Sequence, residues 1–251
     1  MGKLIAVAGK GGAGKSTVAA LVVRYLLERR LTPVLAVDAD PNYTLGDGLG
    51  IPVENTIGML REGFINERAS LPAGMSRDAY LESQLQAGIH ESQGVDLLVM
   101  GRQEGPGCYC ALNNILRRFL DRLAADYRFA VVDNEAGMEH LSRRNTRKID
   151  LLLVVADHTV KATRAAGRIV ELIDELRLEV ADKYLVLNRS PAQIAPEVQG
   201  EIDRSGLPLL VTLPEDPEVR AADAQGKSLL TLSESALCVS ALHAALQRII
   251  S

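Results

Sequence analysis

The sequence contains no tryptophan and only three phenylalanines among its 251 residues. Proteins that bind single-stranded nucleic acid by stacking need a platform of aromatic side chains, and this composition offers little material for one. The net charge of −4 points the same way, because sequence-independent DNA binding requires a strongly basic surface. We therefore expect no nucleic acid among the partners of this chain.

Cysteine is also scarce, and long apolar runs are missing. Cys108, Cys110 and Cys238 are too few and too unevenly spaced for a disulfide framework, which favours a reducing compartment. No apolar run reaches the roughly 18–20 residues that a membrane-spanning helix needs. The apolar run near the N-terminus is too short for a signal peptide and is followed by glycines. We expect a cytoplasmic protein that does not enter membranes.

Short apolar runs alternate with helical patterns along the chain. Continuous Val, Ile and Leu runs separated by helices are typical of a mainly parallel sheet with helices on both faces, which is an α/β fold. The pattern predicts strands over 4–8, 34–37, 96–100, 129–132, 151–156, 184–187 and 209–213. It predicts helices over 16–30, 111–125, 160–176, 194–204, 218–225 and 235–250.

The stretch 47–94 is rich in Gly, Pro and Ser and has weak periodicity. We interpret it as a loop-and-helix insertion after the second strand. Residues 1–251 are then expected to form one domain, a size that is ordinary for a single α/β unit.

A glycine-rich segment follows the first predicted strand and opens the first predicted helix. It fits the Gly-x-x-x-x-Gly-Lys-Ser/Thr phosphate loop, whose backbone N–H groups surround phosphate oxygens. In this motif Lys15 reaches the β- and γ-phosphates, and the Ser16 hydroxyl binds Mg²⁺. The expected nucleotide-binding residues of this segment are Gly9, Lys10, Gly11, Gly12, Ala13, Gly14, Lys15, Ser16 and Thr17.

With the early lysine Lys10, the loop resembles the deviant phosphate loop of the MinD/ParA/nitrogenase-iron-protein ATPases. In that family the early lysine crosses a dimer interface and touches the phosphates of the partner. The resemblance therefore implies a P-loop NTPase fold and a homodimer that closes around ATP. A solvated loop lysine is the alternative interpretation.

Three later segments carry the same resemblance, which implies their roles. Asp38 and Asp40 follow the second strand and resemble switch I, where Asp40 orients the attacking water and Asp38 supports the Mg²⁺ shell; their alternative role is to begin a turn before Pro41. Asp133 ends a buried strand and resembles a Mg²⁺-binding Walker B residue, followed by a switch II segment that includes Gly137. The implied base contacts are Asn188, Arg189, Pro214 and Asp216. A guanine signature is absent from the sequence, so ATP is favoured over GTP.

Cys108 and Cys110 flank Tyr109 in a loop that follows the predicted strand 96–100. Two thiols one residue apart are able to bind one metal ion, but a closed tetrahedral site needs four ligands. Two such loops facing each other in a two-fold dimer would supply four. Soft thiolates suit Zn²⁺ and Ni²⁺. The alternative is two incidental reduced cysteines, and Cys238 is expected in the core.

The Cys-x-Cys loop, together with the segment 133–144, resembles the nickel-insertion ATPases of carbon monoxide dehydrogenase and acetyl-CoA synthase, the CooC/AcsF family. The resemblance implies a metallochaperone that carries Ni²⁺ or Zn²⁺ between two subunits. Its implied partner is apo carbon monoxide dehydrogenase or apo acetyl-CoA synthase.

Two other functions stay open at this stage. One is a reductase like the nitrogenase iron protein with a bridging iron–sulfur cluster, although the switch II segment here has no Cys. The other is a positioning ATPase like MinD or ParA without metal. The C-terminal helix carries only Arg248 and His243 as basic residues, so we expect it to dock on the core and not on a membrane.

Overall fold

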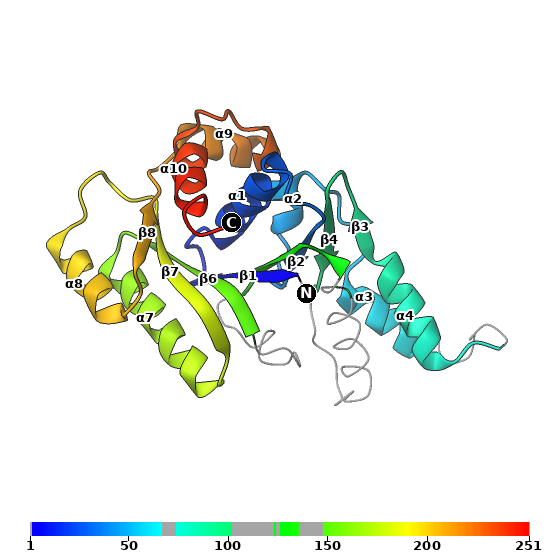
Figure 1. The fold of residues 1–251 in the computed structure, drawn as a ribbon. Helices are drawn as coiled ribbons and strands as arrows, with labels where there is room; N and C mark the ends of the chain where they lie inside the picture. The colour runs from blue at the N-terminus through cyan, green and yellow to red at the C-terminus, as the bar shows by residue number, and fades with distance from the viewer. Residues whose placement is uncertain (1, 67–73, 102–122, 124–125, 136–147, 251) are drawn as a thin grey trace.

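The computed structural model describes residues 2–66, 74–101, 123, 126–135 and 148–250. These residues form an eight-stranded sheet that carries helices on both faces (Figure 1). Among them, no helix combines the length and the apolar character needed to cross a membrane.

The strand order across the sheet is β3-β4-β2-β5-β1-β6-β7-β8. All neighbouring pairs are parallel except β3 and β4, which run antiparallel at one edge. The strands are β1 (Lys3–Gly9), β2 (Val34–Asp38), β3 (Ile89–Glu91), β4 (Val95–Val99), β5 (Phe129–Asp133), β6 (Lys148–Asp157), β7 (Glu179–Asn188) and β8 (Leu209–Thr212).

The helices form one layer on each face. The first layer holds α1 (Lys15–Glu28), α2 (Leu45–Leu49), α9 (Pro217–Gln225), a 3₁₀ turn η1 (Leu229–Thr231) and α10 (Leu237–Leu246). The second holds α3 (Ile57–Asn66), α4 (Arg77–Ala87), α7 (Val160–Glu175) and α8 (Pro196–Ser205).

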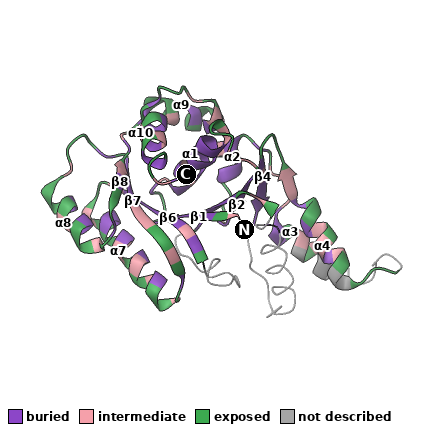
Figure 2. Cartoon of the chain, viewed as in Figure 1, coloured by how far each residue is buried: buried purple, intermediate pink, exposed green. Residues whose placement is uncertain are grey.

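Alternate residues of each central strand face opposite layers. In β1, Ile5 and Val7 pack with α1 and α10, whereas Leu4 and Ala6 pack with the layer of α7 and α8. Both sets are buried, and the sheet is purple over most of its centre in Figure 2. Burial on both faces explains why these strands read as unbroken apolar runs.

The predicted α/β fold is confirmed, and the differences concern the edges of the sheet. β6 and β7 begin earlier than the predicted 151–156 and 184–187. The first part of β7 contains exposed charged residues such as Glu179 and Asp182, so it did not belong to the apolar run on which the prediction rested. β3 was not predicted, since a polar three-residue strand has no periodicity to detect. Within 47–94 lie α3, α4 and β3. Most of the predicted helix 111–125 falls outside the described residues.

Candidate functional site

The glycine-rich loop joins β1 to α1, and three of its glycines occupy positions that disfavour other residues, either by a close approach or by a positive φ. A Cβ at Gly9 would collide with the carbonyl oxygen of Val155 in β6. Gly12 and Gly14 have φ of 77° and 95°, in the left-handed region that favours glycine. The Ala13 N–H donates to the Lys10 carbonyl at 3.1 Å, which closes the loop into a tight turn above the start of α1.

Two residues at the C-terminal end of β7 contact this loop. Asn188 is the last residue of the strand, and Arg189 follows it. The Asn188 amide donates to the Ala13 carbonyl at 2.9 Å, and the Arg189 guanidinium donates to the Gly12 carbonyl. A Cβ at Gly14 would run into the Asn188 amide nitrogen. Two of the four predicted base contacts are therefore already engaged in fixing the shape of the phosphate loop.

The two lysines of the loop lie in opposite environments. Lys15 is only 7% exposed and lines the cavity described below, as expected of a residue that meets phosphates inside the protein. Lys10 is exposed and does not line that cavity. The structure therefore leaves Lys10 accessible from outside the subunit.

Two buried carboxylates meet beside the loop. Asp38 and Asp133 end the neighbouring parallel strands β2 and β5 and pair in register, and both are 0% exposed. The Asp38 oxygens accept from the backbone N–H groups of Asp40 at 3.0 Å and Leu45 at 2.8 Å. Neither Asp133 oxygen has a partner at hydrogen-bond geometry within the described part of the chain, although the Ser16 hydroxyl is near enough to lower the pKa of Asp133.

Burial raises the pKa of Asp133 to about 7 and that of Asp38 to about 6. The Ser16 hydroxyl and the Lys15 ammonium lower the pKa of Asp133, while the negative charges of Asp38 and Asp40 raise it. The ionised form of Asp133 therefore lacks sufficient compensation, and the folded protein keeps the proton on this carboxyl up to about neutral pH. The ionised form is costly unless a cation joins it.

The residues around Asp133 fit a Mg²⁺ ion bound with a nucleotide. Mg²⁺ is commonly held by one or two carboxylates together with phosphates and waters, and not by a complete protein cage. Asp133 supplies an unpartnered carboxylate and Ser16 a hydroxyl at the first turn of α1. Consistent with such an incomplete set, no group of three or more His, Cys, Asp or Glu side chains forms a metal site among the described residues.

The turn after β2 brings a further side chain toward the site. Asp40 is half-buried, and its Oδ1 accepts from the Asn42 backbone N–H at 2.9 Å and from the Asn42 amide at 3.0 Å. This is the turn-forming role that the sequence offered as the alternative for Asp40. The carboxylate also lines the cavity, so the two roles are compatible.

Thr44 was missed by the sequence reasoning. It occupies the N-cap position of α2, yet its hydroxyl does not cap that helix and instead donates to Ser16 Oγ at 2.9 Å. A threonine before a short helix predicts a cap, so only the fold shows that it faces the expected Mg²⁺ ligand.

A cavity of about 850 Å³ lies over these residues. Its volume is within the range usual for small-molecule sites. It is lined by Gly11, Gly12, Gly14, Lys15, Ser16, Thr17, Leu21, Asp40, Asn42, Thr44, Asp47, Gly48, Asn188, Arg189, Leu213, Pro214, Glu215, Asp216, Val219, Arg220, Asp223, Gly226, Lys227, Leu229 and Cys238. All the predicted base contacts are among them, whereas the cavity lining does not include Gly9, Lys10, Ala13, Asp38 or Asp133.

Asp216 has a structural duty besides lining the cavity. Its Oδ1 accepts from the Glu218 N–H at 2.9 Å and caps α9, and its Oδ2 accepts from the Cys238 N–H at 2.8 Å at the start of α10. The Cys238 thiol in turn donates to the Pro214 carbonyl at 3.2 Å, and burial, followed by the Asp216 charge, raises its pKa to about 12. Cys238 is 4% exposed, consistent with the predicted core position, although it also reaches the cavity wall.

Cys108, Cys110 and the switch II segment from 136 onward lie outside the described residues. Their predicted roles stay predictions.

The sequence model for the CobQ/CobB/MinD/ParA nucleotide binding domain, named CbiA, matches residues 4–230. The chain belongs to this family. An uncharacterised ATP-binding protein of Methanocaldococcus jannaschii is 41% identical over 234 residues, which is 92% of either chain. The carbon monoxide dehydrogenase accessory protein CooC of Rhodospirillum rubrum is 29% identical over 252 residues, or 96% of this chain and 93% of that one.

Among solved structures, the septum site-determining protein MinD of Pyrococcus horikoshii, complexed with Mg-ADP, has the same fold. Its TM-score is 0.68 at 19% identity, covering 100% of this chain and 97% of that chain. At this identity the likeness concerns the fold alone. The assignment as a nucleotide-binding protein rests instead on the family model, which matches residues 4–230.

In this MinD/ParA-family chain, free of nucleotide and Mg²⁺, we expect Asp133→Asn to stabilise the fold. The free energy of unfolding at pH 7.5 should rise by about 1–3 kcal/mol, because the neutral amide removes the cost of burying a charge that has no partner. Because folding raises the pKa of Asp133 to about 7, the folded state retains a proton that the unfolded state releases. The stability that Asp133 contributes therefore falls as the pH rises from about 4 to about 7, and the variant should lose this part of the slope but keep the part due to Asp38.

Urea denaturation between pH 5 and 8 measures both effects, with Asp174→Asn at an exposed position of α7 as the matched control. A variant less stable than the wild type at pH 7.5 would contradict the cost assigned to the buried charge.

Proposed function

We propose that this chain is a Mg²⁺-dependent ATPase that hydrolyses ATP to ADP and phosphate. The observation that carries the proposal is the buried, unpartnered Asp133 carboxylate beside a phosphate loop that opens into an 850 Å³ cavity. Membership of a nucleotide-binding family supports it.

The residues divide the work of phosphoryl transfer between positioning and charge neutralisation. The backbone N–H groups around Gly11, Gly12 and Gly14 hold phosphate oxygens, and Lys15 neutralises charge on the β- and γ-phosphates. Asp40 accepts a hydrogen bond from the attacking water. The water oxygen bonds to the γ-phosphorus as the bond from that phosphorus to the bridging oxygen breaks, and ADP leaves. Mg²⁺, when held by Ser16 and Asp133 with support from Asp38, supplies further charge neutralisation.

The proposal includes a homodimer. Lys10 is exposed at the edge of the loop and does not line its own cavity, which suits a residue that completes the phosphate site of a second subunit. Two half-sites for triphosphate would then close face to face.

We further propose that the dimer carries Ni²⁺ or Zn²⁺ as cargo on Cys108 and Cys110 of both subunits. Four thiolates would complete a closed site that one subunit leaves half filled. The CooC relative, matched over 96% of this chain, supports delivery of the ion to an apo-enzyme such as carbon monoxide dehydrogenase or acetyl-CoA synthase.

The positioning ATPases are the second candidate, since MinD and ParA share the family and the fold. One observation separates this chain from a membrane-docked MinD-like function. α10 buries Val239, Leu242 and Leu246 against α1 and the sheet, as predicted from its sequence, so its apolar face is already used.

Lys15→Ala should lower the ATP turnover number by about 10²–10³-fold, the usual effect of removing one electrostatic stabiliser of the transition state. Phosphate release in the presence of Mg²⁺ measures it. Lys161→Ala, at an exposed position on α7, is the matched control and should hydrolyse ATP at the wild-type rate. Retained turnover in Lys15→Ala would remove the loop from the reaction.

Lys10→Ala should weaken dimerisation that depends on ATP, because it removes a charge that meets the phosphates of the other subunit. Light scattering with a non-hydrolysable ATP analogue should show a dimer for wild type and for Lys161→Ala, and a monomer for Lys10→Ala. A dimer of unchanged mass and affinity would contradict the role across the interface.

The double variant Cys108→Ala/Cys110→Ala should lose about one metal ion per dimer, the content of a four-thiolate site. Elemental analysis after loading with Ni²⁺ or Zn²⁺ gives the content, and binding of ATP should stay close to that of wild type. Cys238→Ser serves as the control for a thiol outside the loop. Metal retained by the double variant would place the cargo elsewhere, and a brown chromophore in anaerobic wild-type protein would favour an iron–sulfur cluster.

A further inference from the structure

The segment between α9 and α10 forms part of the wall of the nucleotide cavity. We call residues 226–233 the wall segment; it includes η1. Gly226, Lys227 and Leu229 of this segment line the cavity together with Leu21 of α1 and Gly48 of α2. The segment has little regular structure, so its position must be fixed by contacts with its neighbours.

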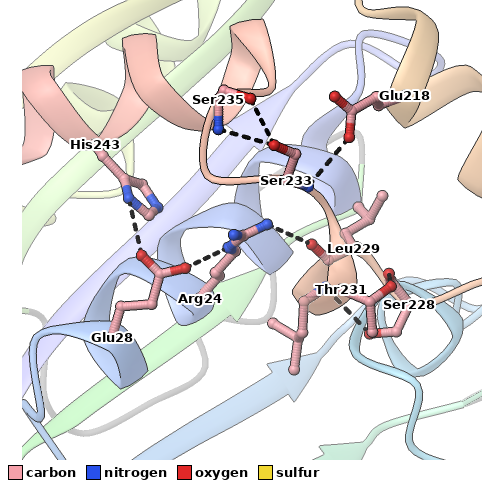
Figure 3. A network of polar contacts seen from close by, with 10 residues as sticks. Arg24, Glu28, Glu218, Ser228, Leu229, Thr231, Ser233, Ser235 and His243 are labelled. Atoms are coloured by element: carbon pink, nitrogen blue, oxygen red, sulfur yellow. Dashed lines mark hydrogen bonds and ion pairs between the residues drawn. The ribbon is translucent and has the colours of Figure 1, made fainter.

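Arg24, at the middle of α1, is a buried polar contact between the core and the wall segment (Figure 3). The residue is only 4% exposed. Its Nη1 donates to the Leu229 carbonyl at 3.3 Å, in a buried hydrogen bond between residues 205 positions apart. Its Nε donates to Glu28 Oε1 at 2.6 Å, which sets the direction of the guanidinium along the helix.

Glu28 is held from the other side by α10. His243 Nδ1 lies 3.3 Å from Glu28 Oε2 (Figure 3). The His243 ring packs edge-on against Tyr25, with the ring centroids 5.2 Å apart. Burial lowers the pKa of His243, while Glu28 raises it and the neighbouring Arg24 and Arg29 lower it further. With the ring mostly neutral at pH 7, the Glu28 charge is compensated mainly by Arg24.

Two further contacts hold the ends of the wall segment. Ser228 Oγ donates to the Gly48 carbonyl at 3.2 Å, and the Ser233 N–H donates to Glu218 Oε2 at 3.1 Å. Ser228 also lies so close to α2 that a Cβ on Gly50 would come within 2.8 Å of the Ser228 Cβ. The wall segment is thus tied to α1 in its middle, to α2 near its start and to α9 near its end.

A buried arginine paired with a carboxylate is a poor way to gain stability, because desolvation of both charges offsets much of their attraction. Here the Arg24 guanidinium donates a hydrogen bond to the backbone carbonyl of Leu229, a residue that lines the ligand cavity. We infer that Arg24 is a positioning residue for nucleotide binding, holding the wall segment in the shape that accepts the ligand. This inference rests on the proposed function, because its ligand is ATP.

Arg24→Met should raise the dissociation constant for Mg-ATP about tenfold, equivalent to about 1.4 kcal/mol, with kcat at saturation within about twofold of wild type. Calorimetric titration of the full chain with Mg-ATP and steady-state hydrolysis give the two numbers. Arg24→Lys, which keeps a charged donor, should recover part of the affinity. Arg29→Met is the matched control, since Arg29 is the C-cap residue of α1 and contacts Gln247 and Tyr25 instead of the wall segment.

Ser228→Ala tests the same wall without removing a buried charge, and it keeps the Cβ that packs on Gly50. We expect a smaller rise in the dissociation constant, about threefold, and again an unchanged kcat. If Arg24→Met does not fold, the dissociation constant and kcat of Ser228→Ala test whether the position of the wall segment controls the affinity for Mg-ATP.

Wild-type affinity in both folded variants, or a fall in kcat at unchanged affinity, would overturn the positioning role alone. A wild-type chain that binds no Mg-ATP would instead overturn the proposed function.

Discussion

Asp38 and Asp133 end neighbouring strands in register, and both are sealed from water. Asp38 is at least supplied with two backbone N–H donors, whereas Asp133 has none among the described residues. Two carboxylates buried side by side are costly when both are ionised, and a cation bound between them would offset that cost. Three segments lie around these two carboxyls: the phosphate loop, the first turn of α1 and the turn after β2.

The parallel sheet explains how these groups come together. In a parallel sheet the residues that follow each strand gather at one edge, where open α/β folds bind their ligands. β1 lies between β5 and β6, so the loop after β1 emerges beside Asp133. Asp38 then fixes the turn that carries Asp40, because its oxygens accept from Asp40 and Leu45. A change in charge at Asp38 therefore alters the hydrogen bonds that hold the turn carrying Asp40, and a change at Asp133 alters the electrostatic repulsion on Asp40. In the proposed reaction this turn faces the γ-phosphate.

The local signals of this sequence predicted the centre of the molecule well. Buried strands such as β1 and β5 read as apolar runs, and the spacing of Gly9, Gly14, Lys15 and Ser16 identifies a phosphate loop without any tertiary information. Contacts between distant segments could not be predicted. Nothing near Asn188 in the sequence shows that its amide holds Ala13, 175 residues away.

The same limit applies to Thr44 and Arg24. The position of Thr44 before a helix predicts a cap, and the fold instead turns its hydroxyl to Ser16. Arg24 interrupts an apolar helical face, and the apolar periodicity gives no reason for an arginine there. Its hydrogen-bond partner, the Leu229 carbonyl, lies 205 positions away in the sequence. Polar groups with long-range partners are thus the part of the site that a pattern of residue types cannot give.

α1 connects the two ends of the site. Its first residues, Lys15 and Ser16, belong to the phosphate loop, and Arg24 holds the wall segment nine residues later. A helix rises 1.5 Å per residue, so these two anchor points are separated by about 13 Å along a rigid rod. Val18, Leu21 and Val22 pack this helix into the core, which holds the two anchor points in place relative to each other. The cavity is lined by Lys15 and Ser16 and also by the wall segment, which suits an extended ligand with phosphates at one end and a group that contacts the wall segment at the other.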